Sequence, residues 1–131
     1  MLVEHGTQGD SEAQKLKQNR NLTMVLIKYV FPLKGMVLVV DVSDKEAVHK
    51  AAEETISQMG EVTLLFNNAG IMPCKPFLTY SQKEVEKIFD VNVFSQFWTV
   101  KEFLPRMINL NKGHIISMSS MAGITGTPNL V

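Results

Sequence analysis

The chain has a single cysteine, Cys74, among its 131 residues. It can therefore form no internal disulfide and no cluster of thiolate metal ligands, so it does not require an oxidising compartment. The three histidines, His5, His49 and His114, include no pair at metal-ligand spacing, and no metal site is predicted. We expect Cys74 to be a small loop residue.

Charge of one sign and long apolar runs are also missing. Thirteen Lys and Arg residues balance thirteen Asp and Glu residues, so we expect no nucleic acid partner. Residues 1–14 are polar and lack the apolar core of a signal peptide. The best candidate for a membrane span, residues 22–33, contains Lys28 and Pro32 and is well short of the roughly 20 residues that a spanning helix needs. No transmembrane helix is predicted in this chain.

What the chain does contain, 45% apolar and 20% charged residues, is typical of one globular domain. The apolar run at residues 36–40 predicts a buried strand. Residues 45–59 have an apolar stripe at helical spacing and stop at a glycine. Ser43 and Glu46 form a Ser-x-x-Glu pattern, which predicts a capping box at the start of this helix. With a second strand at residues 62–67, this order predicts a right-handed βαβ unit.

The longest predicted helix covers residues 81–109. Ser81 and Glu84 repeat the capping pattern at its start. We expect a kink at Asn92 or at Pro105, because proline removes one helical hydrogen bond. The apolar face is wide enough to pack against a sheet and against a partner subunit. It consists of Val85, Ile88, Phe89, Val93, Phe97, Val100, Phe103, Leu104 and Met107.

The amino-terminal residues have weaker patterns. Residues 6–19 are polar, with Asp10 or Ser11 placed to cap a helix. Residues 22–31 are rich in β-branched and large apolar side chains, which favours a strand over a buried helix. We therefore treat the chain as one domain in which residues 1–35 are divergent or poorly ordered.

Polar or small residues follow each predicted strand. Ligands of open α/β sheets bind at the carboxyl ends of the strands, so these residues are candidates for a site. The candidates are Asp41 and Val42 after the strand at 36–40, Asn68, Ala69 and Gly70 after the strand at 62–67, Asn92 in the long helix, and Ser120 after a last strand at 114–118.

Each candidate also has a plainer interpretation. The Asn-Asn-Ala-Gly sequence at residues 67–70 is compatible with an ordinary turn, and Asp41 can simply begin a helix. A buried Asn92 must find hydrogen-bond partners in any fold. Ser120 can satisfy a loop amide, as serines at strand ends usually do.

Taken together, Asn67-Asn68-Ala69-Gly70, Asn92 and Ser119-Ser120 resemble the pattern of the short-chain dehydrogenase/reductase family. Residues 36–131 follow this pattern nearly without interruption. Residues 97–107 are similar to the branch that contains microsomal retinol and 17β-hydroxysteroid dehydrogenases. An unrelated flavodoxin-like binding domain would leave the joint pattern unexplained.

The resemblance implies hydride transfer between NAD or NADP and a small lipophilic alcohol or carbonyl, similar to retinol or a steroid. It also implies a dinucleotide-binding domain over residues 1–131. By resemblance, the location would be the cytoplasmic face of the endoplasmic reticulum or a lipid droplet. Two chains would form a homodimer through the helix at residues 81–109.

The resemblance also implies roles for the candidates. Asp41 would contact the adenine ring, with Val42 beside it. Ser120 would polarise the substrate oxygen, and Asn92 would hold a water molecule in the proton relay. The residues that would pack along the adenosine side of the cofactor are Asn68, Ala69 and Gly70.

Two parts of the family's pattern are absent from these residues. Neither Tyr29 nor Tyr80 has a lysine four positions later, so nothing replaces the family's Tyr-x-x-x-Lys pair. Loss of general acid/base catalysis typically costs roughly 10²–10⁴-fold in rate. No Gly-x-x-x-Gly-x-Gly sequence occurs before Met36, where the family binds pyrophosphate.

We therefore predict an α/β fold with a partial Rossmann-like, doubly wound parallel sheet that lacks its first strands and glycine-rich turn. The predicted function is that of an NAD(P)-dependent oxidoreductase by descent, inactive as this truncated chain. The alternative is a non-catalytic dimerisation or interaction remnant that keeps the helix at residues 81–109.

Overall fold

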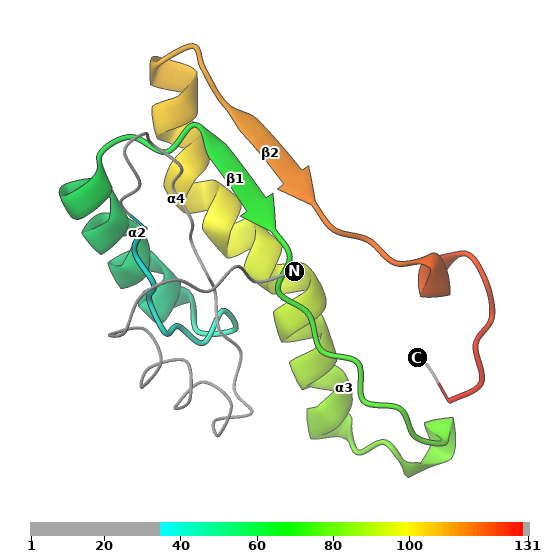
Figure 1. Ribbon diagram of the computed structural model, residues 1–131. Coiled ribbons are helices and arrows are strands. Elements are labelled where there is room, and N and C mark those ends of the chain that lie inside the picture. The colour runs from blue at the N-terminus through cyan, green and yellow to red at the C-terminus, as the bar shows by residue number, and fades with distance from the viewer. Residues whose placement is uncertain (1–34, 130–131) are drawn as a thin grey trace.

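The computed structural model describes residues 35–129 (Figure 1). Its helices are α2 (Lys45–Met59), α3 (Gln82–Phe89) and α4 (Ser95–Asn109), and its strands are β1 (Leu64–Asn67) and β2 (His114–Ser117). Short helical turns occur at Phe77–Thr79, Asp90–Phe94 and Met121–Gly123. The expectations for residues 6–19 and 22–31, and for residues 1–34 of the divergent segment, lie outside the described residues.

The two strands form a parallel pair in the register Leu64 to His114 and Asn67 to Ser117. The strands predicted at residues 62–67 and 114–118 are confirmed, each slightly shorter than expected. Because parallel strands end at the same edge of a sheet, the chain leaves β1 and β2 on the same side (Figure 1).

The strand predicted at residues 36–40 is wrong. This segment runs beside the helices without strand pairing, and the described residues form a sheet of two strands only. Val40 is buried, whereas Val37 and Val39 are about half exposed. A strand needs a neighbour to complete its backbone hydrogen bonds, and none lies beside this segment in the described range. The predicted βαβ unit therefore lacks its first strand here.

Helix α2 begins at a different cap from the predicted one. Asp44 Oδ1 accepts hydrogen bonds from the N–H groups of Glu46 (2.9 Å) and Ala47 (3.2 Å). The capping box of Ser43 and Glu46 is wrong, because the Ser43 hydroxyl donates to Asp41 Oδ1 at 2.6 Å instead. The predicted apolar stripe is confirmed, with buried residues Val48, Ala51, Ala52 and Thr55.

The long helix predicted at residues 81–109 is confirmed as a continuous run of α3, one π-helical turn and α4. Ser81 and Glu84 form the predicted capping box. The irregularity lies in the π-helical turn Asp90–Phe94, which contains Asn92, whereas Pro105 lies inside α4 without ending it. π-helical turns are rare, and those found inside α-helices often occur at functional sites.

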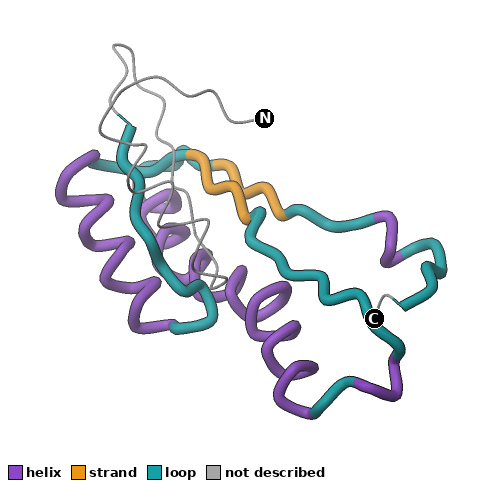
Figure 2. The backbone as a smooth tube through the Cα atoms, turned by 60° about the horizontal axis from the view of Figure 1, so that its bottom comes forward, coloured by secondary structure: helices purple, strands orange, loops and turns teal. Residues whose placement is uncertain are grey.

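Helices α2 and α4 pack together on one side of the two strands (Figures 1 and 2). One group of buried residues joins α2 to the π-helical turn, and a second joins α2 and α4 to β1. The first consists of Val40, Val42, Val48, Ala51 and Val91, and the second of Ala52, Val62, Leu65, Phe103 and Met107. On the opposite face of β1, the side chains of Leu64 and Phe66 are more than half exposed. Within residues 35–129, the sheet is therefore covered on one face.

Candidate functional site

The segments that follow β1 and β2 form the two walls of an open groove of about 740 Å³. Figure 2 shows these segments leaving side by side from the same end of the strands. The first wall consists of Asn68, Ala69, Gly70, Ile71 and Met72, the second of Ser117, Met118, Ser119, Ser120, Ala122 and Gly123, and Asn92 and Gln96 complete the lining. The groove therefore brings together five of the seven predicted site residues.

Asn92 fixes the first wall to the π-helical turn. Its Oδ1 accepts a hydrogen bond from the Ile71 N–H at 2.8 Å, and its Nδ2 donates to the Ile71 carbonyl oxygen at 2.9 Å. A half-buried amide is thereby satisfied on both sides, as the sequence required. The position of Ile71, and with it the start of the loop at residues 71–80, depends on this pair of bonds.

Gly70 lies directly against Asn92. A Cβ atom added at Gly70 would lie 3.6 Å from Asn92 Oδ1, an ordinary van der Waals distance. The fold therefore has room for a small side chain at this position. What the glycine provides is open space in the groove and access to the backbone.

Ser120 lies on the opposite wall, at the start of the Met121–Gly123 turn. Its Oγ accepts a hydrogen bond from the Ala122 N–H at 3.1 Å, so the plainer interpretation of this serine is confirmed. That bond uses the oxygen and leaves the hydroxyl hydrogen, which meets no acceptor among residues 35–129. Ser120 can therefore still donate to the oxygen of a ligand.

Asn67 and Thr99 lie beneath the first wall. Asn67 is buried, and its Oδ1 accepts from the Thr99 hydroxyl at 2.7 Å, which ties the end of β1 to α4. Asn67 Nδ2 is buried without a hydrogen-bond partner in the described part of the chain. The sequence reasoning missed Thr99, although its spacing indicates burial. The buried positions of α4 recur every four residues, at Ser95, Thr99, Phe103 and Met107.

Asp41 and Val42 do not line the groove. Val42 is buried in a core cluster, and Ala69 and Ile71 of the first wall pack against that cluster. Asp41 accepts hydrogen bonds from the Ser43 N–H at 3.0 Å and from Lys87 Nζ at 3.1 Å.

Partial burial is the strongest single influence on the Asp41 carboxyl and by itself raises the pKa. The hydrogen bonds from Ser43 and Lys87 together outweigh burial, so the pKa of Asp41 is lowered from its ordinary value. Asp41 thus remains a carboxylate that links the entry of α2 to α3, consistent with its plainer interpretation.

The groove is neutral. Among the residues that line it in the described part of the chain, none carries a charged side chain, and amide and hydroxyl groups alternate with methionine and small residues. Such a surface can contact the flat rings of a ligand and can form hydrogen bonds to its uncharged polar groups.

No group of three or more His, Cys, Asp or Glu residues within the described range could hold a metal ion. No helix in that range is long and apolar enough to cross a membrane.

The sequence matches the short chain dehydrogenase family over residues 16–131. Epidermal retinol dehydrogenase 2 from Homo sapiens is 43% identical over 90 residues, which cover 69% of this chain and 29% of that protein. Estradiol 17-beta-dehydrogenase 11 from Pongo abelii is 40% identical over 93 residues, which cover 71% of this chain and 31% of that protein. The chain spans about a third of the length of the curated relatives that it matches.

Two solved structures are similar to the described fold. A short-chain dehydrogenase from Streptomyces avermitilis superposes with a TM-score of 0.69 at 25% identity, over 76% of this chain and 36% of the other. ElxO, solved with NADP bound, superposes with a TM-score of 0.63 at 26% identity, over 69% of this chain and 37% of the other. These similarities confirm the partial Rossmann-like α/β fold. The chain therefore belongs to the short-chain dehydrogenase family, in the branch of the retinol and 17β-hydroxysteroid dehydrogenases.

Proposed function

We propose that the groove binds a nicotinamide nucleotide along residues 68–70 and the oxygen of an alcohol or carbonyl at Ser120. The observation that carries this proposal is that Asn68 and Ser120, from segments far apart in the sequence, line one groove. Membership of a family of oxidoreductases and the similarity to ElxO with NADP bound support the same function.

The residues of the groove have distinct parts in this proposal. Ala69 and Gly70 leave space for the nucleotide beside the backbone, and the Asn68 amide offers both donors and an acceptor. Asn92 holds the wall at Ile71, and the Ser120 hydroxyl donates to the substrate oxygen, where negative charge develops. The bound nucleotide would supply or accept the hydride.

The proposed substrate is a small lipophilic alcohol or the corresponding carbonyl compound, similar to retinol or a steroid. Two relatives are named as retinol and estradiol dehydrogenases. In addition, Met72 and Met118 present exposed apolar side chains in a groove that has no charged lining residue. A lipophilic substrate agrees with our further proposal of a location at the endoplasmic reticulum or a lipid droplet.

We propose that the 131-residue polypeptide by itself binds the nucleotide but does not catalyse oxidation or reduction of the substrate. Neither Tyr29 nor Tyr80 precedes a lysine at the required spacing. The Tyr80 hydroxyl donates to the Pro73 carbonyl oxygen, so it is already engaged outside the groove. We expect no nucleotide-dependent oxidation of retinol or estradiol, and measurable turnover would contradict this part.

Titration of NADH and NADPH into the 131-residue protein, followed by nucleotide fluorescence, tests the binding proposal. We expect saturable binding and at least a tenfold loss of affinity in Gly70→Val, whose side chain would fill the groove beside Asn92. Gly126→Val is the matched control, because Gly126 has no neighbour within 4 Å and does not line the groove. Absence of binding to either nucleotide, or equal affinity in Gly70→Val and the unaltered protein, would refute the proposal.

A second candidate function is dimerisation without catalysis. Phe89, Val93 and Phe97 recur every four residues along the long helix, and all three are exposed, with Phe97 at 60%. We propose that this stripe packs against a second copy of the chain. Sedimentation velocity with Phe97→Lys, and with Leu78→Lys as the control at an exposed loop position, tests this. Dimers that dissociate only in Phe97→Lys, together with no nucleotide binding, would favour this second function over the first.

A further inference from the structure

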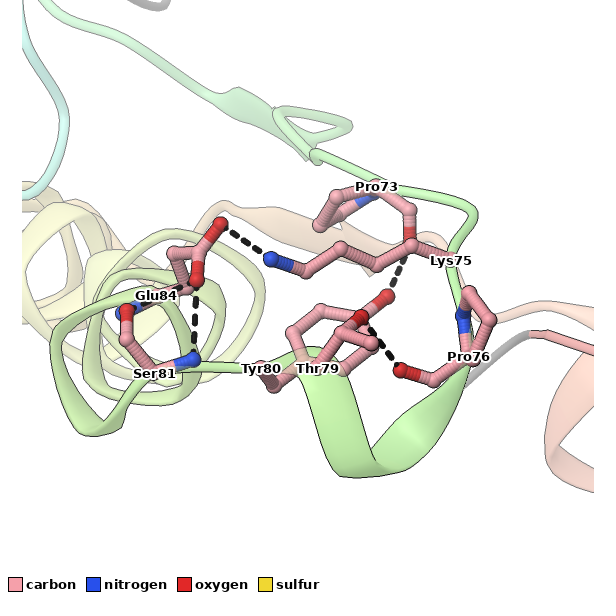
Figure 3. Close-up of polar contacts among 7 residues, drawn as sticks. All are labelled: Pro73, Lys75, Pro76, Thr79, Tyr80, Ser81 and Glu84. Carbon is pink, nitrogen blue, oxygen red and sulfur yellow. Dashed lines mark hydrogen bonds and ion pairs between the residues drawn. The ribbon is translucent and has the colours of Figure 1, made fainter.

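The loop at residues 71–80 is held at both of its ends. Asn92 fixes the inner end through Ile71, where the loop forms part of the groove wall. A polar cluster at the start of α3 fixes the outer end (Figure 3). This cluster lies outside the groove and contains no residue of the proposed binding site.

Lys75 is the centre of the cluster. Its Nζ contacts Glu84 Oε1 at 2.5 Å and lies 4.7 Å from the centroid of the Tyr80 ring. The other carboxylate oxygen of Glu84 accepts from the Ser81 N–H at 2.8 Å and from the Ser81 hydroxyl at 2.7 Å. The Tyr80 hydroxyl in turn donates to the Pro73 carbonyl (Figure 3). The ammonium group therefore holds the loop to the cap of α3.

The main chain of Lys75 reaches the other wall. Its N–H donates to the carbonyl oxygen of Asn129 at 3.2 Å. Asn129 follows the second wall in sequence and has a left-handed backbone with φ 62°, which asparagine tolerates better than most residues. Lys75, in the loop that continues the first wall, is thus bonded to α3 by its side chain and to the segment that continues the second wall by its backbone.

We propose that Lys75 is a positioning residue of the groove. Its side chain locks the loop at residues 71–80 onto α3, so that its backbone N–H meets Asn129 and sets the spacing of the two walls. The wall spacing is a property of the fold alone. Only the consequence for nucleotide binding rests on the proposed function.

The energetics separate this role from a merely stabilising one. The side chains of Lys75 and Glu84 are 29% and 46% exposed, and an isolated ion pair of that exposure contributes little to stability. Its geometry is nevertheless specific, because the same carboxylate also caps the helix and the ammonium lies over an aromatic ring. Loss of Lys75 should therefore loosen the loop far more than it lowers the melting temperature.

Cys74 provides the probe, because it is exposed, adjacent to Lys75 and the single cysteine of the chain. A second cysteine at Thr127→Cys on the other segment allows two spin labels and a distance measurement by pulsed electron paramagnetic resonance. We expect one narrow distance distribution in this background and a broad one after Lys75→Met. Lys75→Arg, which keeps the positive charge, should restore the narrow distribution.

Matched variants make the test decisive. Lys83→Met removes an equivalent charge at the position next to Glu84. Because Lys83 is not part of the ion pair with Glu84, this change should leave the distribution narrow. Glu84→Gln should broaden it, which serves as the second test if Lys75→Met does not fold. In the same set, we expect nucleotide affinity to fall by about twofold to fivefold in Lys75→Met and to recover in Lys75→Arg. An unchanged distribution in both Lys75→Met and Glu84→Gln would overturn the inference, whereas failure of all variants to bind nucleotide would refute only the proposed function.

Discussion

The two ends of the β1–β2 pair are built on opposite principles. At the amino ends, the turn between α4 and β2 is packed so closely that a Cβ atom at Gly113 would lie 2.6 Å from Met107 Cβ. At the carboxyl ends, Gly70, Gly123 and Gly126 have ordinary contacts or open space around them. A glycine is needed at the first end because its neighbour packs so closely, whereas the glycines at the second end have space beside them within the described residues. Close contact around the glycine therefore distinguishes the packed end of the sheet from the open end, which carries the candidate site. Open space alone does not distinguish them, since a pocket of about 510 Å³ also lies beside Gly113 and Met107.

The largest expected effect is at the packed end. Gly113→Ala would force the new methyl group against the buried Met107 side chain, and overpacking of this kind typically costs about 1–3 kcal/mol. Urea denaturation should show this loss in the free energy of unfolding. Gly126→Ala at the open end is the control and should be nearly neutral, since no atom lies within 4 Å. Equal effects at the two glycines would break the comparison.

An intermediate effect is expected at Asn92, which lies at the open end and holds the backbone of Ile71 there. Asn92→Ala removes two hydrogen bonds to Ile71 and should cost about 1 kcal/mol, because the site is only half-buried. Hydrogen exchange should show faster exchange of the Ile71 amide. Ser119→Ala is the control, because the Ser119 hydroxyl lines the groove and makes no hydrogen bond within residues 35–129; it should leave both stability and exchange unchanged. If the Ile71 N–H stays protected from exchange in Asn92→Ala, interactions other than those of the Asn92 side chain hold this wall of the groove.

Local patterns in the sequence predicted one cap correctly and the other wrongly. Ser81 and Glu84 form the expected box, because no stronger acceptor competes with the Ser81 hydroxyl at the start of α3. The same pattern failed at Ser43, because Asp41 takes its hydroxyl and the carboxylate of Asp44 caps α2. The Ser-x-x-Glu pattern alone cannot predict that nearby carboxylates such as Asp41 and Asp44 will form these bonds instead.

Longer-range features divide in the same way. The meeting of Asn68 and Ser120 could be predicted, because it follows from two parallel strands ending at one edge. The strand expected at residues 36–40 could not be judged from its own composition, since strand pairing depends on a neighbour elsewhere in the chain. The bonds of Thr99 and Lys75 were missed for the same reason, because their partners are brought close only by the fold.

The smallest expected effect is the response to acid of the ion pair between Lys75 and Glu84, which lies outside the groove. The Lys75 ammonium and the Ser81 hydrogen bonds lower the pKa of Glu84 from its ordinary 4.5 to about 2. A lowered folded-state pKa means that the contribution of this pair is fully present above pH 4.5 and is lost as the pH falls toward 2. Nuclear magnetic resonance titration of the Glu84 carboxyl carbon should give that low value directly.

The partner of Glu84 can be identified from the same titration. Lys75→Met should raise the Glu84 pKa toward 4.5, because it removes the largest of the influences that lower it, whereas Lys83→Met should leave it low. Since both side chains are partly exposed, added salt should weaken the shift in the unaltered protein. A Glu84 carboxyl that titrates near 4.5 in the unaltered protein would show that the ammonium does not hold the loop to α3. The loop at residues 71–80 would then lack this attachment to α3. The close contact between Gly113 and Met107 would remain the feature that distinguishes the two ends of the sheet.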